Sequence, residues 1–131
     1  MLPTGTVTLL FTDIEGSTRL FQKAPAAMDS ALVRHHEILH EAIESQSGHV
    51  FQIVGDAFCA AFARPIDAVN AALAAQHALR DESWVGIDGL SVRMGIHTGE
   101  IHVREGTYAS SLTLVTVQRV MSSGHGGQTL L

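Results

Sequence analysis

The spacing of apolar side chains divides the first third of the chain into one strand and one interrupted helix. Residues 7–12 form a continuous apolar run with β-branched and aromatic members, which is typical of a buried strand, and a glycine with two hydroxyl residues then opens a helix. Apolar residues recur about every 3.6 positions over residues 28–43, which predicts a long helix. Pro25 should separate a short first piece, residues 17–23, from that helix.

The middle of the chain alternates between strand and helix patterns. Two short apolar runs within residues 49–63 are separated by a single Gly-Asp pair, which predicts a tight β-hairpin. The alanine-rich segment 66–80 follows a proline and predicts a helix. Its larger apolar residues are expected to point inward: Ile66, Val69 and Leu73.

The last third adds two strands, a helix and a final strand. Alternation over residues 90–96 is the strand period, and Thr98-Gly99 is expected to turn the chain into a second strand, residues 100–104. A helix over 111–121 and a strand over 129–131 complete the order. The prediction is an α+β fold: a ferredoxin-like βαββαβ core with an extra hairpin strand and a third helix, built as an antiparallel sheet with helices on one face.

Composition limits the functions that this fold can serve. A length of 131 residues with 46% hydrophobic residues suits a single domain with a sizeable core. The net charge of −5 and the scattered basic residues argue against nucleic-acid binding. The single cysteine, Cys59, lies in an apolar strand and favours a reducing compartment, and no segment reaches the ~18 to 20 apolar residues of a membrane span. A cytoplasmic protein is expected.

Two acidic residues stand where chemistry is usually placed in such folds. Asp13 lies at the tip of the first strand, and Asp56 lies in the predicted hairpin turn. Adjacent tips would bring the two carboxylates into one cleft, and hard oxygen ligands suit Mg²⁺ or Mn²⁺. The free N–H groups at the following helix start could meet phosphate oxygens. The pattern predicts a metal and nucleotide site.

Four segments in order along the chain carry a family resemblance. They are Phe-Thr-Asp-Ile-Glu-Gly-Ser-Thr at residues 11–18, Val-Gly-Asp at 54–56, Arg-Met-Gly-Ile-His-Thr-Gly-Glu at 93–100, and Ser-Ser-Gly-His-Gly-Gly-Gln at 122–128. The chain therefore resembles the class III nucleotidyl cyclase catalytic domain. The resemblance implies one cyclase domain over residues 1–131, with the alternative that its C-terminal strands are missing. It also implies a signalling enzyme that forms 3′,5′-cyclic AMP and pyrophosphate from ATP.

The resemblance also implies roles for individual residues. Two Mg²⁺ or Mn²⁺ ions would be held by Asp13, the backbone carbonyl of Ile14, and Asp56. Arg119 would be the catalytic residue that stabilises charge on the reacting phosphate. The nucleotide would contact Glu15, Gly16, Ser17, Thr18, Gln52, Gly55 and Thr107. In this family the active site lies between two subunits, so a head-to-tail homodimer or a pairing with a related cyclase domain is implied.

Three of the six functional positions depart from the family pattern. Gln52 replaces a lysine that reads the base, Thr107 or Tyr108 replaces its acidic partner, and Val115 replaces the asparagine that precedes Arg119 by four positions. Valine cannot hydrogen-bond the ribose, and loss of one such polar contact lowers turnover by ~10² to 10³. Weak activity and poor discrimination between ATP and GTP are predicted. The alternative is a catalytically inactive module for nucleotide sensing or dimerisation.

A second motif competes with this interpretation. Residues 36–40, His-Glu-Ile-Leu-His, satisfy the pattern that places two zinc ligands on one helical face of a metallopeptidase. The longer form of that motif would need a glycine and a third histidine downstream, where Ile43 and Gln46 stand. We therefore interpret the segment as the solvated face of the first long helix.

Overall fold

A single mixed sheet runs through the molecule. The computed structural model describes all 131 residues. The five strands lie in the order β2-β3-β1-β4-β7, and all neighbours are antiparallel except β4 and β7, which are parallel. Their bounds are β1 Gly5–Ile14, β2 His49–Val54, β3 Ala57–Phe62, β4 Val92–Ile101 and β7 Thr129–Leu130. A separate two-stranded ribbon consists of β5 Val103–Arg104 and β6 Thr107–Tyr108.

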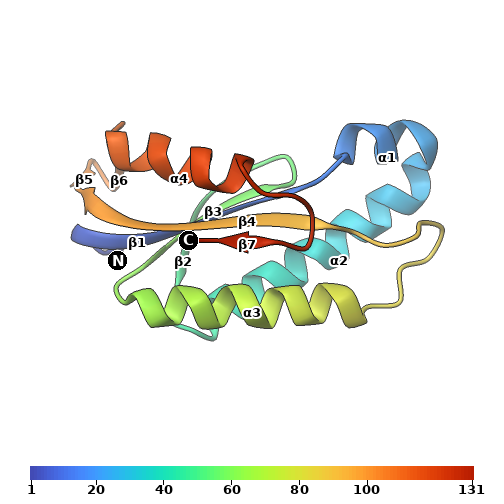
Figure 1. Cartoon of the computed structure of the whole chain (residues 1–131), viewed down its shortest axis with the longest axis horizontal. Helices are drawn as coiled ribbons and strands as arrows, with labels where there is room; N and C mark the ends of the chain where they lie inside the picture. Colours follow the sequence, from blue (N-terminus) through green and yellow to red (C-terminus); the bar gives the residue numbers. More distant parts are fainter.

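The helices lie on both faces of this sheet. Their bounds are α1 Ser17–Lys23, α2 Pro25–Glu44, α3 Pro65–Asp81 and α4 Leu112–Ser122. Helices α2 and α3 cover one face and α4 covers the other (Figure 1). The predicted α+β fold is confirmed, whereas the expectation that all helices share one face is wrong. Pro25 does separate α1 from α2, as its fixed backbone angle predicted.

Strand β4 is longer than its sequence suggested. The predicted turn at Thr98-Gly99 is absent, because β4 continues to pair with β1 through this segment, with Thr98 opposite Thr8. The glycines serve the packing of α4 instead. A side chain at Gly99 would lie 2.8 Å from Oγ1 of Thr113, and one at Gly95 would lie 2.6 Å from Cα of Met121. Helix α4 therefore lies unusually close to β4.

Helix α3 packs through alanines rather than through its larger residues. Ile66 and Leu73 are 49% and 52% exposed, which contradicts the predicted inward face, while Val69 is half-buried against the core. The buried residues of α3 are Ala68, Ala71, Ala72, Ala75 and Leu79. Small side chains allow the axis of α3 to lie close to α2 and to the sheet. At this short distance the interface has room for alanines but not for the larger side chains of Ile66 and Leu73.

The alternation of side chains decides which face carries the polar groups. Odd-numbered residues of β1, such as Leu9 and Phe11, belong to the core beneath α4, whereas Leu10 and Ile14 belong to the core beneath α2 and α3. Asp13 follows the odd pattern, since strand side chains alternate strictly between faces. The end of β1 therefore presents its carboxylate on the α4 side.

Candidate active site

The end of β1 and the β2–β3 turn meet through one hydrogen bond. The N–H of Ile14 donates to Oδ2 of Asp56 at 2.8 Å. Gly55 adopts φ 61°, a left-handed conformation that glycine reaches without strain and that closes the turn. The Asp56 carboxylate thus lies at the residue that follows Asp13, so the two tips meet as predicted, while the roles of Asp13 and Asp56 as metal ligands stay predictions.

Arg93 binds Asp13 in this structure. Its Nε and Nη2 donate to the two carboxylate oxygens of Asp13 at 2.8 and 2.7 Å, and the two residues lie opposite each other on β4 and β1. The hydrogen bond to Asp13 raises the pKa of Arg93 above its ordinary value, and the charges of Glu15 and Asp56 act in the same direction. Sequence reasoning assigned no role to Arg93, because the contact depends on the register of strands that are far apart in the chain.

The turn after β1 leaves several backbone donors free. Gly16 adopts φ 69° at the start of α1, and no side chain caps the helix. The first N–H groups of a helix have no acceptor within it, so those of Gly16, Ser17 and Thr18 are available to an anion. Glu15 differs, because its N–H donates to the carbonyl of Ser91 at 2.8 Å and its carboxylate accepts from the N–H of Gly126.

The positions predicted to read the base lie on the edge strand β2 and on strand β6 of the separate ribbon. A bulge in β2 places Gln52 opposite Cys59, on the α4 side, and leaves its side chain exposed. Tyr108 is buried: its hydroxyl donates to the carbonyl of Pro3 at 2.6 Å, and burial raises its pKa to about 12. Thr107 is exposed. Of the two candidates for the missing acid, only Thr107 has a side chain free for a ligand.

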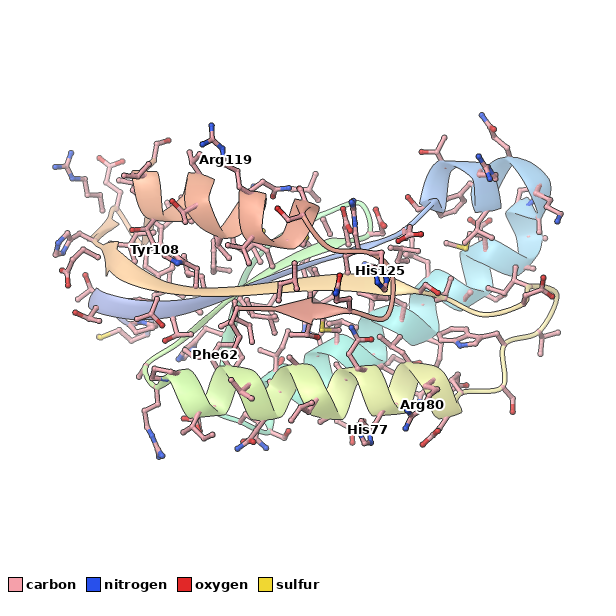
Figure 2. The ribbon with its side chains drawn as sticks, in the orientation of Figure 1. Phe62, His77, Arg80, Tyr108, Arg119 and His125 are labelled. Atoms are coloured by element: carbon pink, nitrogen blue, oxygen red, sulfur yellow. The ribbon has the colours of Figure 1, made fainter.

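Helix α4 directs its predicted catalytic face to solvent. Val115 is 48% exposed, and Arg119, one helical turn later on the same face, forms no salt bridge. Arg119 points away from the sheet (Figure 2). One chain therefore does not bring Arg119 to the carboxylates of Asp13 and Asp56.

The histidines of α2 are packing residues. The rings of His36 and His40 are half-buried and lie 4.9 and 5.2 Å from the ring of Phe58 in edge contacts, whereas Glu37 is exposed. The expectation of a wholly solvated face is wrong for both histidines, since Phe58 on β3 packs beneath them. No group of three or more His, Cys, Asp or Glu side chains is arranged to hold a metal ion. The edge contacts with Phe58 favour a packing role for both histidines over zinc ligation.

Replacing His36 and His40 with alanine should lower the free energy of unfolding by about 1 to 2 kcal/mol, because two ring contacts with Phe58 are lost. Urea denaturation measures this change. Glu37→Ala is the control and should change stability by less than ~0.5 kcal/mol, since Glu37 is exposed. Stoichiometric zinc in the purified protein that disappears in the double variant would contradict this assignment.

A family match distinguishes the cyclase-like segments from the His-Glu-Ile-Leu-His motif as the guide to function. Residues 1–108 match the model of the adenylate and guanylate cyclase catalytic domain. The chain belongs to this family. The match covers Asp13, Asp56 and Arg93 of the cyclase domain but ends before α4, the helix in which Val115 replaces the expected asparagine.

Relatives cover most of this cyclase domain but are much longer proteins. An uncharacterized protein of Mycobacterium tuberculosis is 37% identical over 131 residues, which is 98% of this chain and 43% of the relative. A receptor-type adenylate cyclase of Trypanosoma brucei brucei is 31% identical over 98% of the chain and 14% of its own length. The chain thus spans less than half of these relatives.

Solved structures agree with the fold of the cyclase domain. A Trypanosoma brucei adenylate cyclase structure, described as monomeric, has a TM-score of 0.89 at 27% identity and covers 97% of this chain and 73% of that one. A guanylyl cyclase domain from Blastocladiella emersonii has a TM-score of 0.85 at 17% identity, covers 96% of this chain and 80% of that one, and supports the fold alone.

No helix of this chain has the length and apolar character needed to cross a membrane.

Proposed function

We propose that residues 1–131 form one cyclase domain that converts ATP into 3′,5′-cyclic AMP and pyrophosphate, slowly and with poor selectivity against GTP. The observation that carries this proposal is the Ile14–Asp56 hydrogen bond, which holds Asp56 beside Asp13 at the end of the central strand. Two adjacent carboxylates followed by free backbone N–H groups provide for both metal and triphosphate.

The donor set suits Mg²⁺ or Mn²⁺. Asp13, the carbonyl of Ile14 and Asp56 would supply hard oxygen ligands, and these ions usually take one or two carboxylates and complete their coordination with substrate phosphates and water. Bound there, the ions would lower the pKa of the ribose 3′-hydroxyl and neutralise charge on the phosphates. These residues therefore fit the two ions implied by the family.

Arg93 has to change partner for this chemistry to proceed. In the structure its guanidinium is the counter-charge of Asp13 at 2.7 Å, so a cation that binds Asp13 competes with it. The carbonyl of Ser91, two residues before Arg93, accepts the N–H of Glu15, so a guanidinium released from Asp13 would lie near the turn that begins at Gly16. Its planar set of donors suits phosphate oxygens.

The residues at the predicted base-binding and ribose-binding positions account for the expected poor selectivity and slow turnover. Gln52 and Thr107 offer neutral polar groups to a purine, and an amide that both donates and accepts discriminates poorly between adenine and guanine. Arg119 and Val115 face away from the acids, so a second chain, either another copy or a related cyclase domain, has to present its α4. Val115 then meets the ribose with no hydrogen bond, which favours the alternative of an inactive sensing or dimerisation module.

The Val115→Asn variant tests the proposal. Restoring the polar contact should raise the rate of cyclic nucleotide formation by ~10-fold or more, measured with Mn²⁺ and with Mg²⁺. Val85→Asn makes the same chemical change at a loop residue that is 85% exposed and should leave the rate unchanged. A folded, dimeric Val115→Asn protein that forms no cyclic nucleotide would favour the non-catalytic module.

A further inference from the structure

Glu15 joins the end of β1 to the loop that follows α4. Its carboxylate accepts a hydrogen bond from the N–H of Gly126, a residue 111 positions later, and its own N–H donates to the carbonyl of Ser91 at 2.8 Å. Figure 1 shows the α4–β7 loop passing beside the segment that joins β1 to α1. Glu15 is thus attached through its backbone to Ser91, the residue before β4, and through its side chain to the loop.

The loop has little freedom to absorb a displacement of Glu15. The N–H of Gly127 donates to the carbonyl of Val92 at 2.9 Å, and the N–H of Ser123 donates to the carbonyl of Arg119 at 3.1 Å. A side chain at Gly126 would overlap Cβ of Ser91 and lie 3.1 Å from its carbonyl carbon. The Glu15 contact therefore falls on a short, anchored segment that begins directly after Ser123, the C-cap residue of α4.

The same contact keeps a negative charge away from the free backbone donors. Gly16 follows Glu15 directly, and a carboxylate turned toward its N–H would repel a bound phosphate. The bond to Gly126 holds the Glu15 carboxylate toward the loop instead. Glu15 is also one of the charges that act on Arg93, so it lies within reach of the Asp13–Arg93 pair.

We propose that Glu15 is a positioning residue that transmits cation binding at Asp13 and Asp56 to α4 of the same chain through Gly126. This inference rests on the proposed function, in which the acids of one chain serve one active site and its α4 serves the other. In a head-to-tail homodimer, the Glu15–Gly126 hydrogen bond then links the two active sites.

Amide hydrogen exchange and a Mg²⁺ titration followed by NMR test this proposal on the full chain. In Glu15→Ala, the Gly126 amide should exchange about tenfold faster, because a hydrogen bond to a charged acceptor is lost. Mg²⁺ should shift the amide signals of Gly126 and of α4 in the wild type but shift only those near Asp13 and Asp56 in Glu15→Ala. Glu15→Gln retains a neutral acceptor and should keep the coupling. Glu41→Ala, an exposed residue of α2, is the control and should behave as the wild type.

Each result decides between defined outcomes. Gly126→Ala breaks the same contact from the loop side and should reproduce the loss of coupling seen in Glu15→Ala. Equal responses of α4 to Mg²⁺ in the wild type and in Glu15→Ala would overturn the proposal. Absence of Mg²⁺ binding to the wild type would instead refute the proposed metal site, and the Gly126 exchange rate would still decide whether Glu15 anchors the loop.

Discussion

Asp56→Asn should reduce cyclic nucleotide formation by at least ~10²-fold while the protein remains folded. The asparagine carbonyl can still accept the N–H of Ile14, which keeps the β2–β3 turn attached to β1, but the negative charge that attracts a cation is lost. Calorimetric titration with Mn²⁺ should show the matching loss of affinity, and Asp13→Asn should behave in the same way.

Two further variants separate charge from structure. Asp56→Ala also removes the acceptor for Ile14 and should lower the free energy of unfolding by about 1 to 3 kcal/mol. Asp29→Asn neutralises an exposed aspartate of α2 and should change neither activity nor Mn²⁺ affinity. Unchanged Mn²⁺ affinity in both Asp13→Asn and Asp56→Asn would exclude these residues as the metal site.

Stability should fall by about 3 kcal/mol as the pH drops from 6.5 to 4, through His35 alone. Burial lowers the pKa of His35 to about 4, and the neighbouring His36 adds to the effect. In the unfolded chain, His35 is therefore protonated below about pH 6.5, whereas in the folded chain it is protonated only below about pH 4. The contribution of neutral His35 to the free energy of unfolding is fully present above pH 6.5. It decreases as the pH falls from 6.5 to about 4, and it changes no further below pH 4.

Thermal unfolding between pH 7 and pH 4 measures this effect, which corresponds to a decrease in Tm of ~10 °C. His35→Leu is the informative variant, because leucine fills the buried position without titrating and should flatten the dependence on pH. His77→Leu replaces an exposed histidine and should leave the dependence as it is in the wild type. An equally steep fall in His35→Leu would assign the effect to other groups.

The sequence was most informative where local chemistry decides structure. Pro25 ended α1, and the Gly-Asp pair produced the β2–β3 turn that places Asp56 near Asp13. Both outcomes depend on a few adjacent residues with restricted or permissive backbones. The turn itself was therefore predictable from adjacent residues, whereas its position beside the end of β1 also depends on the pairing of β1 with β3.

Contacts between distant segments were harder to predict. The Arg93–Asp13 pair depends on strand register, and Gly99 was interpreted as a turn although its lack of a side chain makes room for Thr113. In α3, periodicity favoured Ile66 and Leu73 as core residues, but the close approach of the helix selected alanines. The spacing of apolar residues indicates which face of a helix or strand is buried, but it does not indicate how closely that face packs against its neighbour.

Alternation along β1 makes the site intolerant of changes in strand length. Asp13 reaches the α4 side only because an even number of positions separates it from Leu9 and Phe11, which point the same way. Deletion of one residue between Val7 and Thr12 would turn the carboxylate toward the core beneath α2 and α3, where Ile14 now lies. Insertions and deletions in β1 are therefore expected only in pairs, whereas substitutions at its buried positions are limited mainly by volume.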